Sequence, residues 1–442
     1  MPTTEVPTEI ELLYELKPCA DEHSAVIANK PLLPCAYFRK WGVWHSFDYE
    51  PGESLATPQI NLKSAYSGRQ PLVAEALSGC RKAPIMAVGI NPNLPGWSRP
   101  NSANPTFDEV QEYAHYFRYR ATAKLDIPLA DYQHFGGDPH DPPLSTAELA
   151  VPRDVNGRKT IPLERQPVPM YEGYEALLTD MAQAMGWKTA KLTVGEDLSY
   201  GNMIACPSAK WLLRPFSQDK RMPPMTRPEM EGIVTECFVT RKYFLRQLAH
   251  SMPAVLLVFS QSTTDAFLQQ MQGNFTLGDP KVGEKVEALV DREIRLGFTG
   301  VAHDARVIFS PHITGNPQAF KVFRPKVLAQ LIDEAKRGGI SFNPVTGRLA
   351  RAIGPCSLCP TMAIGRCDYS DELQQHGSTV EASEAASRSV ARSQKQLEAE
   401  IVAEFIKRNI AARATPAAIG PTIAEDSSNG WILAAQHEDN KE

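Results

Sequence analysis

The chain lacks the long hydrophobic runs of a membrane protein. A helix that crosses a bilayer needs about 18 or more consecutive apolar residues, and no stretch of the 442 residues approaches that length. The first residues, MPTTEVPTEIELLYELKP, are acidic and contain no apolar core of a secretory signal. We therefore expect a soluble protein of the cytoplasm.

The chain also lacks an excess of basic residues. Lys and Arg number 46 and Asp and Glu number 51, which gives a formal net charge of −5. Residues 371–442 carry 12 acidic and 7 basic side chains, so they account for all of this charge. Because residues 1–370 are neutral as a whole, a nucleic-acid partner would need a local basic surface. Clusters around Arg241 and Arg324 could provide one, although solvated helix faces explain these clusters equally well.

The composition and the order of apolar segments indicate an α/β fold. Hydrophobic residues make up 43% of the chain and charged residues 22%, close to average globular usage, which argues against extensive disorder, collagen and coiled coil. Apolar runs typical of buried strands lie at residues 84–89, 200–205, 255–259 and 306–309. Helical patterns lie at about 107–124, 174–185, 226–250 and 381–413. This alternation predicts a three-layer sandwich with a mainly parallel central sheet covered by helices on both faces.

We expect four parts along the chain. Residues 1–82 form an irregular, Pro-rich N-terminal extension to which we assign no function. Residues 83–350 form the α/β domain, and an insertion rich in Pro, Asp and Gly lies within it at about 97–166. Residues 351–370 form a cysteine-rich segment that binds a metal ion or cluster. Residues 371–442 form an acidic tail that is partly helical and partly disordered.

Three loops at predicted strand ends carry polar side chains. Their sequences are GINPN at 89–93, GNMIACP at 201–207 and SPHITGNP at 310–317. Ligands of open α/β sheets bind at the carboxyl ends of the strands. Each loop alone could be an ordinary turn, but the order and spacing of the three favour one shared site.

These motifs resemble those of the uracil-DNA glycosylase superfamily. The stretch AVGINPNLPGW at 87–97 is similar to the first motif of its mismatch-specific and single-strand-selective branches. The stretch FSPHITGNPQAF at 309–320 resembles the second motif, with Ile313 and Thr314 in place of the usual Pro and Ser. The helices and strands between them follow the order of the family, and the resemblance covers about residues 84–323. It implies a uracil-DNA glycosylase-like fold, DNA as the partner and a base flipped out of the duplex.

The resemblance also implies roles for particular residues. Asn91 and His312 would be catalytic: the Asn91 amide would position the attacking water, and His312 would donate a hydrogen bond to the departing base. Asn202 would read the edge of the base. The remaining substrate-binding positions would be Gly89, Ile90, Pro92, Tyr171 (with Met170 as the competing alignment), Thr314, Gly315 and Asn316. No lysine stands at the first motif to form a Schiff base, which argues against a lyase.

The cysteines suggest a second site. Cys356 and Cys359 form a CxxC followed by Cys367, and in a cytoplasmic chain this pattern favours metal over disulfide. Zinc could use these three residues with His376. Some branches of the superfamily carry a 4Fe-4S cluster, and Cys206 and Cys237 occupy two of its ligand places. The resemblance therefore implies a cluster on Cys206, Cys237, Cys356 and Cys359, with Cys367 as a substitute, although the CxxC of the family precedes the first motif.

The expected function is that of a monofunctional DNA glycosylase that leaves an abasic site. Its substrate would be uracil, in DNA repair, or a bulky modified pyrimidine of phage DNA such as glucosylated hydroxymethylcytosine, in antiviral defence. The sequence leaves two alternatives open. One is a catalytically silent nucleic-acid-binding protein of the same fold, and the other is a metal or iron-sulfur redox protein.

Overall fold

The structure is a computed structural model that describes most of the α/β domain and the helices around it. The described residues are 6–24, 75–90, 110, 114, 117–118, 124–128, 153–155, 158–164, 169–205, 234–352, 354, 356–362 and 394–414.

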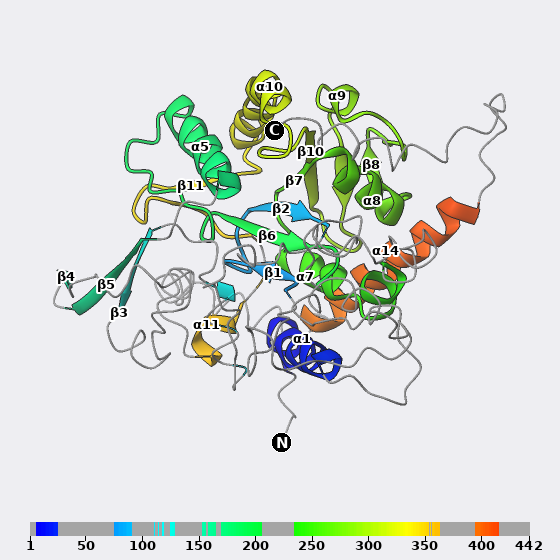
Figure 1. Ribbon diagram of the computed structural model, residues 1–442, viewed down its shortest axis with the longest axis horizontal. Helices are drawn as coiled ribbons and strands as arrows, with labels where there is room; N and C mark the ends of the chain where they lie inside the picture. Colours follow the sequence, from blue (N-terminus) through cyan, green and yellow to red (C-terminus); the bar gives the residue numbers. More distant parts are fainter. Residues whose placement is uncertain are drawn as a thin grey trace, which may run out of the picture.

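A seven-stranded sheet forms the centre of the molecule (Figure 1). In spatial order its strands are β1 (Leu77–Ser78), β6 (Leu198–Asn202), β2 (Ile85–Gly89), β7 (Val255–Phe259), β10 (Asp304–Ser310), β9 (Arg295–Gly297) and β8 (Phe275–Leu277). The four strands predicted from the sequence are β2, β6, β7 and β10, and they pair in parallel. The outer strands β1, β9 and β8 pair antiparallel, so the sheet is mixed, with a parallel centre.

Helices cover both faces of this sheet. On one face lie α5 (Pro169–Ala184) and α10 (Pro317–Lys336), which share a core with alternate residues of the strands. The other face is covered by α1 (Thr8–Ser24), α7 (Tyr243–Ser251), α8 (Gln261–Met271) and α14 (Gln394–Ala414). Figure 1 shows α5 and α10 on one side of β2 and β6 and α1 and α7 on the other. The predicted α/β class is confirmed, and helices on both faces of the sheet are compatible with the predicted three layers. No helix in the described part of the chain is long and apolar enough to cross a membrane.

The residue pattern explains how the layers are held together. In β2, Ile85 and Ala87 belong to the core beneath α5 and α10, whereas Met86 and Val88 belong to the opposite core. Successive side chains of a strand point to opposite faces, so a strand buried on both sides is apolar at every position. Full burial of one large apolar side chain contributes about 1.5–3 kcal/mol.

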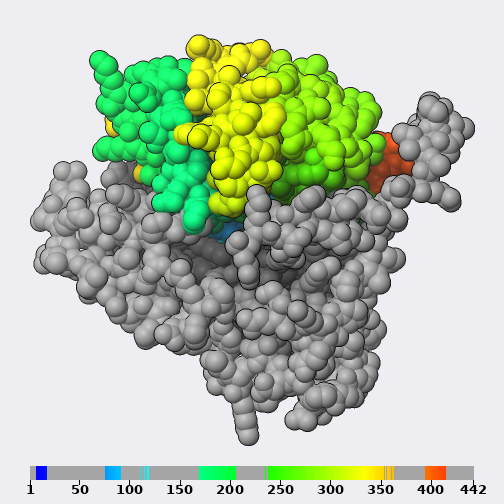
Figure 2. Space-filling view, turned by 45° about the horizontal axis from the view of Figure 1, so that its top comes forward, coloured from blue at the N-terminus to red at the C-terminus, as the bar shows by residue number. Residues whose placement is uncertain are grey.

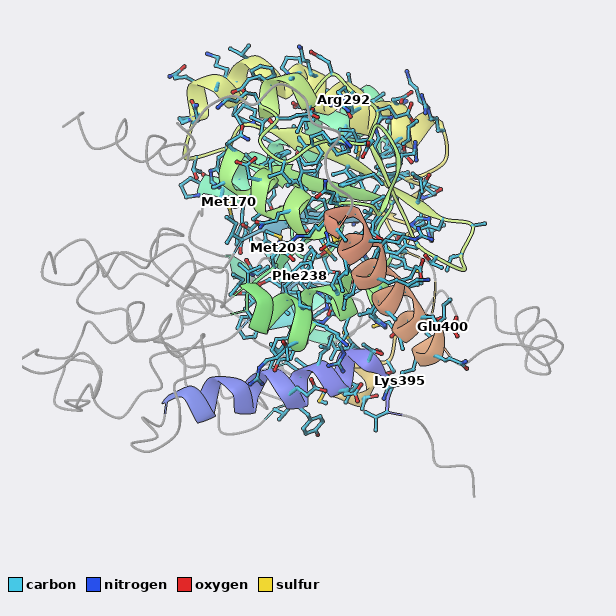
Figure 3. All side chains as sticks on the ribbon, turned by 90° about the vertical axis from the view of Figure 1, so that its right-hand side faces the viewer. Met170, Met203, Phe238, Arg292, Lys395 and Glu400 are labelled. Atoms are coloured by element: carbon cyan, nitrogen blue, oxygen red, sulfur yellow. The ribbon has the colours of Figure 1, made fainter. Side chains whose placement is uncertain are left out.

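The two terminal segments each contribute a helix to the core. In α1, Leu12 and Leu13 are buried in the same cluster as Phe405 of α14. Lys395 of α14 forms an ion pair with Glu11 of α1, with 3.2 Å between Nζ and Oε2. Figure 3 shows the end of α14 that carries Lys395 beside α1. The N-terminal extension is therefore not irregular over α1, because its apolar side chains are needed to cover the sheet.

Smaller elements complete the described chain. The insertion contains an antiparallel sheet of β3 (Lys124–Pro128), β5 (Arg158–Glu164) and β4 (Arg153–Val155), which the sequence did not predict. The helix expected near 107–124 is seen at residues 110, 114 and 117–118, and a strand begins at Lys124. The remaining elements are α9 (Val286–Leu289), β11 (Phe342–Asn343), β12 (Arg348–Leu349) and α11 (Leu358–Thr361).

The helix predicted over 226–250 is not continuous. A π-helical segment, η3 (Thr235–Thr240), precedes α7. Lys242 separates the two with a left-handed backbone, at φ +62°. That conformation does not continue a right-handed helix, so the prediction of a single helix was wrong at this point.

A buried ion-pair group ties β6 to the insertion and to the end of the α/β domain. Glu196 Oε2 lies 2.9 Å from Arg118 Nη2 and 3.2 Å from Arg351 Nη2. Burial alone would raise the pKa of the Glu196 carboxyl, but the two guanidinium groups outweigh burial and lower this pKa. A carboxyl with a lowered pKa stabilises the fold above its unfolded pKa, about 4.3, and loses this contribution as the pH falls through its folded pKa.

Glu196→Gln should therefore lower the free energy of unfolding by about 3–5 kcal/mol at pH 7, because it leaves buried guanidinium groups without their charge partner. The difference from wild type should shrink below about pH 4. Urea unfolding at several pH values measures both effects. Glu404→Gln is the control, because Glu404 pairs with Arg408 at the exposed surface of α14 and its removal should change little. A constant difference from pH 7 to pH 3 would contradict the assignment.

Candidate functional site

The four parallel strands bring the first residues of the three predicted loops to one edge of the sheet. Gly89 at the end of β2 is in register with Asn202 at the end of β6, and Phe259 of β7 is in register with Ser310 of β10. Adjacent strands lie about 4.8 Å apart, so the ends of β2 and β10, with β7 between them, are about 10 Å apart. His312 follows β10 by two residues. In Figure 2, part of the segment that contains β2 is visible beside the surfaces of α5 and α10.

Asn202 is the most informative residue of this edge. Its side chain lies on the face of the sheet that α5 covers, because it alternates with Leu198 and Tyr200 of the same core. Only 1% of the residue is exposed, and neither its amide oxygen nor its amide nitrogen has a hydrogen-bond partner among the described residues. A buried polar group without a partner costs about 1–3 kcal/mol. Such a group in a native fold suggests a partner that arrives with a ligand.

A group of aromatic side chains lies next to Asn202. The rings of Tyr171 and Tyr174, both from α5, have centroids 6.3 Å and 6.5 Å from that of Tyr200. Tyr174 also stacks on Phe259 at 5.6 Å, and Phe259 lies 5.8 Å from Phe320 of α10. Burial, followed by the neighbouring Tyr200 and Tyr171, raises the pKa of the Tyr174 hydroxyl, which therefore stays neutral. The structure thus has an apolar, aromatic wall along the strand ends.

Sequence reasoning selected Tyr171 of this wall and missed Tyr174, Tyr200 and Phe259. Tyr200 stands two residues before Asn202 on the same strand, so period-two alternation could have placed both side chains on one face. Ser310, at the end of β10, was also missed. Its hydroxyl is fully buried and has no hydrogen-bond partner in the described part of the chain.

Gly89 is required by the position of Tyr200. A Cβ atom built on Gly89 would lie 2.3 Å from the Tyr200 hydroxyl oxygen and 2.8 Å from Cζ of the ring. Real Cβ atoms do not approach other atoms so closely, so a larger residue would push the tyrosine out of place. The glycine of the first motif therefore lets an aromatic side chain lie over the end of β2. Ile90, which follows it, is buried.

The loop after β10 fixes the orientation of the His312 ring. Its Nδ1 accepts hydrogen bonds from the backbone N–H of Gly315 at 2.8 Å and of Thr314 at 3.2 Å. A ring nitrogen that accepts hydrogen bonds carries no proton, so the neutral ring has its proton on Nε2, which is a donor. Ile313 anchors the loop against α5, since a Cβ built on Gly173 would lie 2.4 Å from Ile313 Cγ2.

The other residues of this loop have defined positions. Asn316 caps α10, because its Oδ1 accepts the backbone N–H of Ala319 at 3.2 Å. Thr314 and Gly315 are exposed. Asn316 therefore stabilises the start of α10. The sequence had predicted a substrate-binding role for it.

Ser260, which follows β7, has a strained backbone. Its φ of +98° is rare for a residue with a side chain. Its Oγ accepts the N–H of Thr263 at 3.1 Å, and its own N–H donates to the Ser310 carbonyl at 2.9 Å. Strain of this kind costs about 1–3 kcal/mol and is concentrated at functional sites. No pattern in the sequence indicated this strain.

Several predicted residues lie outside the described part of the chain. These are Asn91, Pro92, Cys206, Cys367 and His376. The convergence of Asn91 with His312 therefore stays a prediction.

Ion pairs neutralise part of the two predicted basic clusters. In the first, Arg246 pairs with Glu11 and Glu15 of α1. In the second, Arg324, Lys326, Arg337, Arg348 and Arg351 pair with Asp180, Asp291, Glu293, Asp197 and Glu196 respectively. Lys321, in the first turns of α10, is exposed and has no ion pair among the described residues.

Three of the predicted cysteine ligands are described. Cys237 and Cys359 are buried in one apolar cluster, and Cys356 packs against it. Cys237 Sγ accepts the backbone N–H of Ala205 at 3.3 Å, so it lies next to the residue that precedes Cys206. No disulfide joins the described cysteines.

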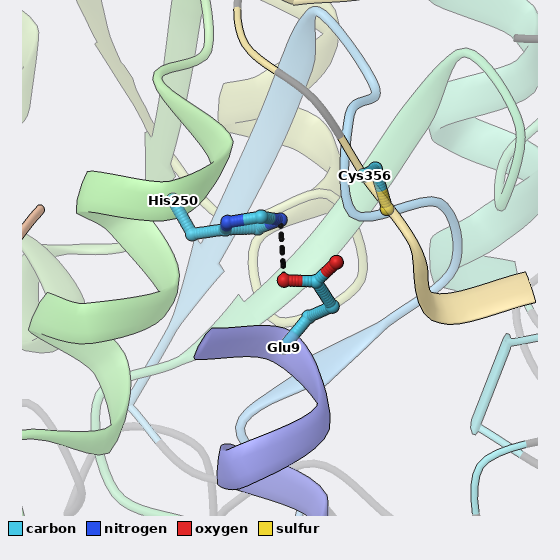
Figure 4. Close-up of side chains that lie close together, drawn as sticks. All are labelled: Glu9, His250 and Cys356. Atoms are coloured by element: carbon cyan, nitrogen blue, oxygen red, sulfur yellow. Dashed lines mark ion pairs between the residues drawn. The ribbon is translucent and has the colours of Figure 1, made fainter. Parts of the chain in front are cut away.

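Cys356 faces two residues that sequence reasoning did not select as ligands. The ligand atoms of Glu9, His250 and Cys356 all lie within 4.8 Å of one another, which makes a possible metal-binding group (Figure 4). Glu9 comes from α1 and His250 from α7. The sequence offered little signal for this group, since its members are more than 100 residues apart and follow no spacing rule.

Charged and ionisable side chains surround this group. The ammonium of Lys82 is buried and donates to the His250 carbonyl oxygen, and burial lowers its pKa. Burial, followed by the charge of Glu9, raises the pKa of the Cys356 thiol to about 12. In the absence of a metal ion, this thiol therefore keeps its proton at neutral pH.

No protein-family model and no curated protein matches this chain.

Proposed function

We propose that this protein is a monofunctional DNA glycosylase, which hydrolyses the bond between deoxyribose and a pyrimidine, either uracil or a modified base. One observation carries the proposal: the amide of Asn202 is buried without a hydrogen-bond partner in the described residues, beside a wall of tyrosines. An amide offers both a donor and an acceptor, which the polar edge of a pyrimidine requires. Aromatic rings offer the stacking surface that an unstacked base requires.

The chemistry of the reaction fits the residues at this edge. Cleavage of an N-glycosidic bond leaves negative charge on the departing base and positive character on the sugar. The His312 Nε2–H is a preorganised donor for the anionic base, because backbone N–H groups fix the ring by its other nitrogen. Asn91, two residues beyond Gly89, would hold the water that attacks the sugar. After it adds to the sugar, this water loses a proton to solvent, since an amide is not a base, and the released base anion takes up a proton from solvent.

Access to the base requires that the nucleotide leave the duplex. Arg246 of the first basic cluster and five residues of the second are held in ion pairs, so these residues contribute little to DNA binding. Lys321 on α10 is the described candidate for a phosphate contact near His312. Modest net charge suits an enzyme that holds its substrate through the flipped nucleotide more than through long-range attraction.

We propose a 4Fe-4S cluster on Cys206, Cys237 and Cys359, with zinc as the alternative metal. Cys367, the predicted substitute, would be the fourth thiolate in place of Cys356, because Cys356 faces Glu9 and His250. The hydrogen bond from the Ala205 N–H to Cys237 Sγ supports this set, because Ala205 is the residue that precedes Cys206. A cluster here would have a structural role. Anaerobically purified protein should then be brown and contain iron and sulfide.

The activity can be tested with defined oligonucleotides and with phage genomic DNA. The oligonucleotides carry uracil or a modified pyrimidine. One of the phage genomes contains glucosylated hydroxymethylcytosine. The expected product is an alkali-labile abasic site. Asn91→Ala should lower its formation at least about tenfold, because the attacking water loses its position. Asn93→Ala in the same loop is the matched control.

Binding assays on the same substrates separate the enzyme from a silent DNA-binding protein. Tight binding with no alkali-labile site on any substrate would contradict the glycosylase. Equal loss of product in the Asn91 and Asn93 variants would contradict the assigned role of Asn91.

A further inference from the structure

We propose that Glu9, His250 and Cys356 bind a zinc ion, which fastens α1 and the segment before α11 to α7. This site is separate from the strand-end site and does not depend on the proposed glycosylase activity. Figure 4 shows the three side chains converging from three elements that are distant in sequence.

The distances fit a site that closes around an ion. In tetrahedral zinc sites the bonds of about 2.0–2.3 Å place ligand atoms about 3.3–3.8 Å apart. Glu9 Oε2 and His250 Nε2 are already 3.4 Å apart, and all three ligand atoms lie within 4.8 Å. Small rotations of the Glu9 or Cys356 side chain would complete the geometry. The fourth position would be filled by water or another ligand.

The His250 ring points to an ion between these residues. Only 2% of His250 is exposed. Its Nδ1 lies 2.8 Å from Glu398 Oε1 in a hydrogen bond, whereas its buried Nε2 makes no hydrogen bond within the described chain. A metal-binding histidine typically donates its second N–H to a carboxylate, which leaves the first nitrogen for the metal. His250 has this arrangement, with Nε2 directed toward Glu9 and Cys356.

The Glu9 carboxylate is held in a similar way. Its Oε1 accepts hydrogen bonds from the N–H of Ser357 at 2.6 Å and from the hydroxyl of Ser357 at 3.0 Å. The second oxygen, Oε2, is the one that faces His250. Ser357 also neighbours Cys356 in the chain, so the bonds that orient one ligand also position the other. Such supporting contacts are characteristic of metal ligands.

The charges and the donor types favour zinc. A thiolate of Cys356 together with Glu9 and Glu398 brings three negative charges, and Lys82 brings one positive charge. A divalent ion would make the buried group neutral, which a low-dielectric interior requires. One sulfur, one nitrogen and one oxygen ligand suit zinc better than the oxygen-seeking magnesium or calcium.

Metal analysis of the full-length protein tests the proposal. After expression with added zinc and thorough dialysis, wild type should contain about one zinc per chain. His250→Gln and Cys356→Ser should each reduce the zinc content about tenfold or more. His303→Gln is the matched control and should keep the zinc, since His303 lies outside the group and its Nε2 is within hydrogen-bond distance of the Pro253 carbonyl, at 3.1 Å. Cys237→Ser should also keep it, while losing any iron.

His250 is buried, so the His250→Gln variant could lose zinc simply because it does not fold. A second measurement, on the wild-type protein, avoids this ambiguity. Removal of zinc by 1,10-phenanthroline should lower the melting temperature by about 3 °C or more, and added zinc should restore it. Cobalt in place of zinc should give a thiolate charge-transfer band that Cys356→Ser abolishes. The proposal is overturned if wild type retains less than about 0.1 zinc per chain and shows no cobalt band. It is equally overturned if folded His250 and Cys356 variants keep their zinc, or if Cys237→Ser loses it.

Discussion

His312→Ala should slow base excision about 100- to 1000-fold and leave the fold intact. Removal of one preorganised hydrogen-bond donor from a site that stabilises a developing anion has effects of this size. His312 qualifies as such a donor because Gly315 and Thr314 hold its Nδ1 and leave the proton on Nε2. Since the loop is exposed, water can satisfy these two N–H groups in the variant. This prediction rests on the proposed glycosylase function.

To test the role of His312, the single-turnover rate and the DNA affinity of the His312→Ala variant are compared with those of wild type. His312→Ala should change the rate far more than the affinity, because the donor acts on charge that develops in the transition state. His303→Ala is the control, since His303 precedes the amino end of β10, the opposite end of the strand that leads to His312. A variant that keeps more than about a tenth of the wild-type rate would exclude His312 from the reaction.

The sequence predicted the parts of the fold that depend on local pattern. Apolar runs at β2, β6, β7 and β10 identified four strands that are buried on both faces, and buried strands of this kind pair in parallel. The spacing of Leu177, Leu178 and Met181 identified α5. The short edge strands could not be predicted in this way, because two or three residues have no measurable period.

The contributions of the chain termini were also beyond local pattern. Residues 1–82 are rich in proline, which obscured the helix α1, and the acidic composition of the tail obscured the buried face of α14. Both helices are stabilised by tertiary burial of a few apolar side chains, such as Leu13 and Phe405, more than by propensity.

Some residues of the candidate site could likewise be predicted from local pattern, and others could not. Asn202 and Gly89 could be identified because each stands at the end of a recognisable strand. The aromatic wall, the strained Ser260 and the unpartnered Ser310 depend on contacts between elements, which no single segment encodes. Glu9 and His250 were missed for the same reason. A site assembled from distant segments becomes visible only when the sheet order is known.

Asn202→Leu should make the protein more stable and less active. Leucine has the same branching and number of side-chain heavy atoms as asparagine, so it fits the same space without the unpaired amide. The variant should gain up to about 1–3 kcal/mol in the free energy of unfolding, which is the cost of a buried polar group without a partner. Loss of the amide contacts to the base should lower activity roughly 5- to 150-fold, equivalent to about 1–3 kcal/mol. Urea unfolding and single-turnover excision measure the two effects.

Asn409→Leu is the matched control, and it should change the free energy of unfolding in the opposite direction. The Asn409 amide is also buried, but its Nδ2 donates to the carbonyl oxygens of Gln269 at 2.9 Å and Gln272 at 3.3 Å. Its replacement leaves both carbonyl groups short of a donor and should destabilise the protein by about 1–3 kcal/mol. Opposite signs at two buried asparagines would show that Asn202 is kept for binding and not for stability. If Asn202→Leu destabilised the protein as much as Asn409→Leu, Asn202 would have a structural partner and its role in base recognition would lose its support.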